Sequence, residues 1–168
     1  HQYFNTPAMS GGTRSFEMAR RLVKMGHEVN LVTAWRDPVD SKNIFETTES
    51  GINVYWIPVP YFNAMGFWNR CLAFIQFAFR SAKLSASIPS DIIFATSTPL
   101  TIAIPAVYAS FFQKVPMVFE VRDLWPELPI AIGLLKNPFL IKIARLLESW
   151  AYRNSSAIVA LSPGMKQG

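Results

Sequence analysis

Short apolar runs alternate along this chain with longer segments whose apolar residues recur at helical spacing, and this alternation is the strongest constraint on the fold. The apolar runs predict buried strands over residues 28–34, 52–59, 91–95, 117–121 and 157–161. The helical patterns predict helices over residues 13–25, 67–87, 100–112 and 139–153, with a short helix at 127–133. This alternation predicts the α/β fold class: a doubly wound, mostly parallel, Rossmann-like sheet with helices on both faces.

The stretches between these elements complete the outline. Residues 1–10 and 35–51 are polar and irregular, which predicts surface loops. Residues 96–99, Thr-Ser-Thr-Pro, predict a helix start with a hydroxyl cap. The length of 168 residues suits a single domain over residues 1–168. A central first strand would normally precede the first helix, and no such strand precedes it here, so we expect a fragment.

Composition limits the classes of partner. The net charge of +5 favours an anionic partner such as a nucleotide diphosphate, a lipid phosphate or a membrane surface. The basic residues are scattered without a recognised motif, so nucleic acid is not an expected partner. Cys71 is the only cysteine, and its apolar neighbours predict a buried, inert thiol. His1 and His27 are too few and too far apart to predict a metal site.

A glycine pair stands directly before the first predicted helix. Gly11 and Gly12 would let the backbone approach a ligand, and a helix N-terminus offers free N–H groups to a phosphate. Arg14 adds a formal charge in the first turn. We therefore expect Gly11, Gly12, Thr13 and Arg14 to form a phosphate-binding turn. The alternative is a plain turn that needs a positive φ.

A second candidate site lies where the run over 117–121 ends. Glu120, Arg122 and Asp123 follow one another at the carboxyl end of a predicted strand, and ligands bind at that edge of an open α/β sheet. Trp125-Pro126 then turns the backbone away, because proline cannot continue a ladder. The alternative is that Arg122 and Asp123 form a structural ion pair that caps the following turn.

The segment over 61–87 is unusually aromatic and carries only basic charges. Its helix is apolar almost all round, so it must be buried in protein or in lipid. Aromatic and basic residues together, such as Trp68 and Arg70, are typical of a helix that lies on an anionic membrane. A core helix is the alternative that we favour, and both can hold if the end over 61–68 touches lipid. The chain contains no uninterrupted run of ~18 or more apolar residues, so the sequence predicts no helix that spans a membrane.

These motifs together resemble a known family. The matching segments are His1-Gln2-Tyr3-Phe4, Ser10-Gly11-Gly12-Thr13-Arg14-Ser15, Gly26-His27-Glu28-Val29, Glu120-Val121-Arg122-Asp123-Leu124-Trp125-Pro126 and Ala160-Leu161-Ser162-Pro163-Gly164-Met165. The chain resembles the N-terminal half of a family-4 glycosyltransferase of the GT-B fold, and it most resembles bacterial enzymes of capsule, O-antigen and exopolysaccharide assembly. The resemblance implies a single Rossmann-like domain whose first strand and C-terminal donor domain lie outside the sequence.

The resemblance also implies a function and roles for residues. The domain would bind the acceptor in a retaining hexosyl- or acetamidohexosyltransferase, with a UDP-sugar donor and no other cofactor or obligatory metal. Gly11 and Gly12 would contact the donor diphosphate through backbone N–H groups. Arg122 takes the position at which many relatives carry histidine, where it would neutralise phosphate or orient the sugar. Asp123 keeps the family's aspartate and would hold an acceptor or sugar hydroxyl.

The remaining expectations concern the acceptor and its location. A saccharide carried on polyprenyl diphosphate would explain the basic, aromatic segment, and the acceptor or the membrane would contact Trp68, Arg70, Glu120 and Trp125. The protein would be cytoplasmic, with a peripheral contact at the inner face of the plasma membrane. The fragment alone would be inactive and would bind nucleotide sugar weakly. The alternative function is a non-catalytic Rossmann-like module that docks to membrane or a protein partner.

Overall fold

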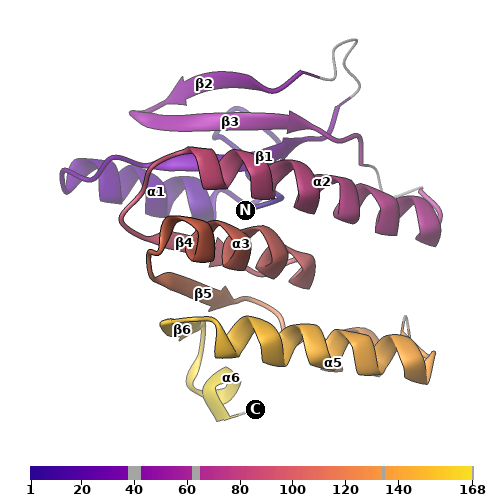
Figure 1. Cartoon of the computed structure of the whole chain (residues 1–168). Helices are drawn as coiled ribbons and strands as arrows, with labels where there is room; N and C mark the ends of the chain where they lie inside the picture. Colours follow the sequence, from indigo (N-terminus) through magenta and orange to yellow (C-terminus); the bar gives the residue numbers. More distant parts are fainter. Residues whose placement is uncertain (38–42, 62–64, 134, 168) are drawn as a thin grey trace. The chain divides into compact units, whose positions relative to one another are not determined.

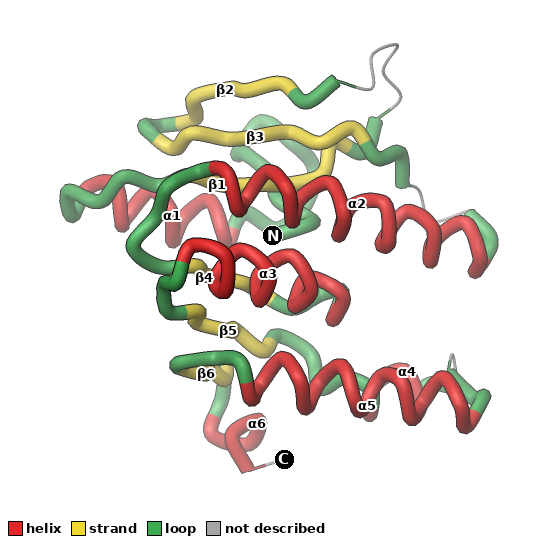
Figure 2. Tube along the Cα trace, viewed as in Figure 1, coloured by secondary structure: helices red, strands yellow, loops and turns green. Residues whose placement is uncertain are grey.

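The computed structural model describes residues 1–37, 43–61, 65–133 and 135–167 (Figures 1 and 2). The chain forms two compact units, His1–Leu84 and Ser85–Gly168, and each is described by itself. Both units combine a sheet with helices, and parallel pairing joins β1 to β3, β4 to β5 and β5 to β6, so the predicted α/β class is confirmed. Within the described residues, no helix combines the length and the apolar character needed to cross a bilayer.

The first unit is a three-stranded sheet with helices. Its elements are α1 (Arg14–Lys24), β1 (Asn30–Trp35), β2 (Phe45–Glu49), β3 (Ile52–Pro58) and all but the last turn of α2 (Phe67–Ser87). The strand order is β1-β3-β2; β1 pairs with β3 in parallel, and β2 pairs with β3 in antiparallel. The apolar face of α1 packs on β3 and forms the core of this unit, which comprises Phe4, Phe16, Ala19, Ile52, Val54 and Trp56.

Strand β2 corrects the prediction of a loop over 35–51. Cross-strand contacts stabilise it: the rings of Phe45 and Trp56 stack at 6.2 Å, and Trp56 Nε1 donates to Thr47 Oγ1 at 2.9 Å. Ser50 and Gly51 have φ values of 53° and 83°, which suit the tight turn of a two-residue hairpin. The Ser50-Gly51 pair is therefore a hairpin signal in the sequence, although the polar residues around it are typical of a loop. Residues 38–42 lie outside the described residues.

The start of the chain lies along β1. Residues 1–6 form no assigned strand, as predicted, but the Phe4 side chain is fully buried. The Gln2 carbonyl accepts hydrogen bonds from Thr33 Oγ1 at 3.2 Å and from the Ala34 N–H at 3.3 Å. This segment is therefore a buried partner of β1 and not the surface loop that its composition predicts.

The second unit has an all-parallel sheet in the order β4-β5-β6. Its elements are β4 (Ile93–Thr96), the 3-10 helix η1 (Leu100–Ile102), α3 (Ala103–Gln113), β5 (Met117–Val121), α4 (Glu127–Ala131), α5 (Pro138–Arg153), β6 (Ala157–Ala160) and α6 (Pro163–Gln167). Helix α3 packs on β4 and β5, and α5 contacts β5 through the rings of Tyr152 and Phe119, 6.1 Å apart. Asn137 caps α5, because its Oδ1 accepts a hydrogen bond from the Phe139 N–H at 2.9 Å.

Candidate functional site

The main candidate site is at the carboxyl ends of β4 and β5. The register pairs Thr96 with Glu120, so the residues that follow each strand emerge at the same edge of the sheet. Thr96, Ser97 and Thr98, which we call the hydroxyl triplet, leave β4 at this edge. Arg122 and Asp123 leave β5 beside them.

Each member of the hydroxyl triplet makes a hydrogen bond to the end of β5. Thr96 Oγ1 donates to Glu120 Oε2 at 2.7 Å, and Thr98 Oγ1 donates to Asp123 Oδ2 at 2.6 Å. Ser97 Oγ accepts from the Arg122 N–H at 2.8 Å, and the Ser97 N–H donates to the Glu120 carbonyl at 2.8 Å. These bonds fix the backbone of Arg122 and one oxygen of the Asp123 carboxylate.

The prediction that these hydroxyls cap a helix is therefore wrong. The residue before η1 is Pro99, and no side chain makes a capping bond there. A carboxylate oxygen is a stronger acceptor partner for a hydroxyl than a neutral group is, and Glu120 and Asp123 lie within reach. Thr98 also has a φ of 102°, which is uncommon for a β-branched residue, and residues in such strained conformations cluster at functional sites.

The ion pair expected under the structural alternative is absent. Within the part of the chain that the structure describes, no ion pair joins Arg122 to Asp123 or to any other carboxylate. Both side chains are partly exposed. The arrangement thus presents a guanidinium and an oriented carboxylate at the ligand-binding edge of a parallel sheet.

Glu120 and Trp125 occupy different surroundings. Glu120 is only 1 % exposed, and its buried carboxylate accepts the hydrogen bond from Thr96 of the hydroxyl triplet. Its predicted contact with the acceptor or membrane stays a prediction. Trp125 is partly exposed and precedes Pro126, where the backbone turns into α4: the Leu128 N–H donates to the Leu124 carbonyl at 2.8 Å. The predicted turn after Asp123 is confirmed.

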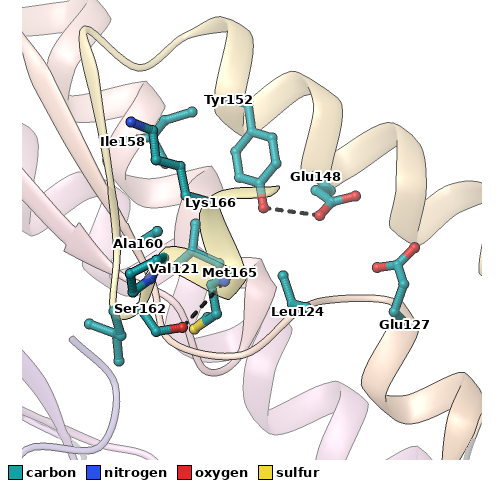
Figure 3. A pocket seen from close by; sticks show the side chains of 12 residues that line it. Val121, Leu124, Glu127, Glu148, Tyr152, Ile158, Ala160, Ser162, Met165 and Lys166 are labelled. Atoms are coloured by element: carbon teal, nitrogen blue, oxygen red, sulfur yellow. Dashed lines mark hydrogen bonds between the residues drawn. The ribbon is translucent and has the colours of Figure 1, made fainter. Parts of the chain in front are cut away.

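A cavity of about 940 Å³ lies in the second unit, next to the turn that carries Asp123 (Figure 3). It is lined by the ends of β5 and β6 and by parts of α4, α5 and α6: Val121, Leu124, Glu127, Glu148, Tyr152, Ile158, Ala160, Leu161, Ser162, Pro163, Met165 and Lys166. Figure 3 shows the Tyr152 hydroxyl directed at the Glu148 carboxylate, to which it donates at 3.0 Å. Apolar walls with a few carboxylate and hydroxyl groups are typical of a site for a small molecule.

Burial is the main cause of the shifted pKa values of Tyr152 and Glu148. Burial raises the pKa of Glu148 above its usual value, while the hydrogen bond from Tyr152 acts in the opposite direction. Burial, followed by the interaction with Glu148, raises the pKa of Tyr152. Sequence reasoning missed this pair, because nothing in the pattern of α5 indicates that its polar face borders a cavity.

The glycine turn belongs to the first unit. Gly11 has a φ of 131°, and a Cβ at Gly11 would overlap the amide nitrogen of Asn5. A Cβ at Gly12 would meet no atom within 4 Å, so the backbone at Gly12 is open to a ligand on that side. Helix α1 begins at Arg14, and Thr13 makes no side-chain capping bond there. The positive φ that the plain-turn alternative requires is present at Gly11, and phosphate binding stays a prediction.

Helix α2 has both a buried and an exposed apolar face. Ala73, Phe77 and Ala78 are buried, as a core helix requires. The opposite stripe remains exposed and comprises Trp68 (75 %), Leu72, Ile75 and Phe79 (72 %). The two interpretations of this segment therefore apply to different faces, while the membrane contact itself stays a prediction.

Two smaller predictions concern side chains near α2 and metal ligands. Arg70 Nε donates to the Met65 carbonyl at 2.9 Å, which holds its guanidinium near the start of α2. Cys71 was predicted to be buried, but it is only partly buried; burial raises the pKa of its thiol. Among the described residues, no group of His, Cys, Asp and Glu side chains is clustered closely enough to hold a metal ion.

Fold and site together define the class of protein. Parallel strands with polar groups at their carboxyl ends, combined with packed helices, are typical of a Rossmann-like α/β domain. Residues 11–168 match the family described as Glycosyl transferase 4-like domain. Because the match covers most of the chain, the chain belongs to this family: it is a family-4 glycosyltransferase domain, and its reaction involves a sugar donor and an acceptor. None of the curated proteins compared with the chain matches it.

Proposed function

We propose that the chain is the acceptor-binding half of a retaining glycosyltransferase of bacterial surface-polysaccharide synthesis. The enzyme would transfer a hexosyl or acetamidohexosyl group from a UDP-sugar to a saccharide linked to polyprenyl diphosphate. The observation that carries this proposal is the Asp123 carboxylate, held by Thr98 Oγ1 at 2.6 Å at the edge where parallel strands end.

The chemistry of sugar transfer supports these roles. The leaving diphosphate gains negative charge in the transition state, and a guanidinium such as that of Arg122 stabilises such charge. The sugar gains positive character, so a carboxylate near it stabilises the transition state or anchors a hydroxyl. Asp123 suits this role because Thr98 already fixes the direction of one of its oxygens.

The glycine turn supports donor binding in the first unit. The backbone at Gly12 is open on one side, and Thr13 immediately precedes the N-terminus of α1, where N–H groups are unpaired within the helix. Such N–H groups bind phosphate oxygens. We assign the diphosphate contact to Gly11, Gly12, Thr13 and Arg14, and we propose no metal and no cofactor besides the donor.

The acceptor and its lipid carrier account for the remaining features. The cavity beside Leu124 offers Glu127, Glu148 and Tyr152 to saccharide hydroxyls. The exposed stripe of α2, with Trp68 near one end, offers apolar surface to a membrane interface, and the net charge of +5 favours an anionic lipid surface. We place the enzyme at the inner face of the plasma membrane as a peripheral protein.

Substitution of Asp123 in the full-length enzyme tests the proposal. Asp123→Asn keeps the shape of the side chain and removes its charge, and we expect transfer of labelled sugar to lipid acceptor to fall by roughly 100-fold or more. Asp91→Asn is the matched control, because Asp91 is exposed and precedes β4 in the same unit. Full activity of the Asp123 variant would favour the alternative, in which the exposed stripe of α2 makes the domain a docking module without catalytic function.

A further inference from the structure

Asn5 is a buried polar residue that contacts both glycines of the glycine turn. Its side chain is 6 % exposed, and its Nδ2 donates to the Gly12 carbonyl at 3.4 Å. The same nitrogen occupies the space that a Cβ on Gly11 would need. A side chain larger than hydrogen at Gly11 is therefore excluded by Asn5 as well as by the backbone conformation.

Arg36 holds the other end of the Asn5 amide. Its Nη2 donates to Asn5 Oδ1. A guanidinium has only donors, so it selects the amide orientation in which Oδ1 faces Arg36 and Nδ2 faces Gly12. Arg36 follows directly after β1, at the edge of the sheet where ligands bind in this class of fold.

Aromatic rings hold Arg36 in place. Its guanidinium carbon lies 5.9 Å from the centre of the Tyr3 ring, and the Tyr3 and Tyr61 rings are 5.5 Å apart. The Tyr61 N–H also donates to the Arg36 carbonyl at 3.3 Å. Within the described residues, no carboxylate forms an ion pair with Arg36. The partners that the structure describes for Arg36 are therefore neutral, and its contacts with Tyr3 and Tyr61 hold it in place.

The hydrogen bond to Gly12 has a geometric consequence for the turn. In a trans peptide the C=O and the N–H point in opposite directions. The bond that the Gly12 carbonyl accepts from Asn5 therefore directs the Thr13 N–H away from Asn5. Without this bond, the peptide between Gly12 and Thr13 could rotate, because glycine adopts many backbone conformations at little cost.

We propose that Asn5 and Arg36 are positioning residues for the glycine turn: Arg36 sets the orientation of the Asn5 amide, and Asn5 fixes the peptide whose N–H faces the donor diphosphate. This inference rests on the proposed function, which assigns the diphosphate to the glycine turn. It adds two residues that contact no substrate themselves and determine how well the turn distinguishes a diphosphate from a monophosphate.

The experiment measures nucleotide binding by calorimetry on the full-length enzyme. UDP, GDP, ADP and dTDP are titrated first, and the tightest-binding diphosphate is then compared with its monophosphate. Asn5→Leu removes both hydrogen bonds at similar volume and adds no charge. Arg36→Lys keeps the charge and loses the fork of donors. Asn154→Leu is the matched control, because Asn154 Nδ2 also donates to a backbone carbonyl, that of Trp150 at 2.7 Å, in the other unit.

We expect the preference for diphosphate over monophosphate to fall by roughly 10-fold in Asn5→Leu and Arg36→Lys and to stay unchanged in Asn154→Leu. Binding of the monophosphate should change little in all variants, which a general loss of folding would not allow. Asn5→Gln, which keeps a donor and an acceptor, should recover part of the preference.

The outcomes separate this inference from the proposed function. A wild-type enzyme that binds no diphosphate, or binds it no better than the monophosphate, would refute the diphosphate role of the turn and the inference with it. A wild-type preference that Asn5→Leu retains would overturn the inference alone. If Asn5→Leu does not fold, Arg36→Lys decides by itself, and an unchanged preference in that variant overturns the inference.

Discussion

The bond from Thr98 to Asp123 gives the most direct test of the candidate site. Thr98→Val removes the hydroxyl that donates to Asp123 Oδ2 at 2.6 Å and keeps the size and β-branching of the side chain. The backbone at Thr98 has a φ of 102°, and valine resembles threonine in shape, so the strain at this position should change little. The variant therefore isolates the hydrogen bond.

The structure allows an estimate of the effect. A hydrogen bond to a charged group contributes about 1.5–3 kcal/mol. Both side chains are partly exposed, so water screens part of this energy, and we take the lower half of the range. If the whole loss appears in the transition state, kcat/KM falls by roughly 10- to 50-fold.

The assay is transfer of labelled sugar by the full-length enzyme, with kcat/KM measured alongside the midpoint of thermal unfolding. Thr98→Ser keeps the hydroxyl and should recover most of the activity. Thr48→Val is the matched control, because Thr48 is an exposed residue of β2 in the other unit. If Thr98→Val keeps kcat/KM within about twofold of wild type, the bond does not position Asp123 for transfer, and the reasoning about the hydroxyl triplet is wrong.

Two further predictions concern stability. Gly11→Ala should destabilise the protein by about 1–3 kcal/mol in chemical denaturation, because φ at Gly11 is 131° and Asn5 fills the space for a Cβ, while Gly12→Ala should have a smaller effect; equal effects would contradict this. Burial raises the pKa of Glu148, so the folded state binds this proton more tightly than the unfolded state, and stability contributed by protonation is lost as pH rises above the usual value of 4.5. In chemical denaturation, the free energy of unfolding of Glu148→Gln should decline less with rising pH over that range than the free energy of unfolding of the wild type. Parallel curves would contradict this prediction.

The sequence predicts the helices and strands whose beginning and length depend on neighbouring residues along the chain. Helix α5 begins where Asn137 and Pro138 indicate, and α2 spans the predicted range because no proline or glycine interrupts it. Strand β2 was missed because its residues are polar, and its stability comes from pairing with β3. A propensity argument cannot detect this, since strand preference depends largely on the neighbouring strand.

The same contrast between local signals and contacts of distant residues explains which parts of the candidate site the sequence predicts. Arg122 and Asp123 were found because they end an apolar run. The sequence assigns the hydroxyl triplet to a helix cap, because its true partners, on β5 and just after it, are 24 or 25 residues away along the chain. Asn5 gave no signal at all: it lies in a segment that resembles a loop, and its partner Arg36 is 31 residues further along the chain. Polar contacts between distant residues require the fold before they can be identified.

The hydroxyl triplet gives Arg122 and Asp123 different degrees of constraint. Ser97 fixes the backbone of Arg122, and Thr98 fixes the carboxylate of Asp123. The Arg122 guanidinium, by contrast, has no ion-pair partner among the residues that the structure describes. A group that must orient one hydroxyl benefits from being held in place before the substrate arrives, because the ordering cost is then met during folding. A cation that follows the charge of a leaving phosphate acts over a longer range and needs less exact placement. The hydrogen-bonded carboxylate of Asp123 and the Arg122 guanidinium without an ion-pair partner among the described residues therefore agree with the separate roles proposed for them. The two residues should differ in their tolerance: Arg122→Lys should retain more activity than Asp123→Glu.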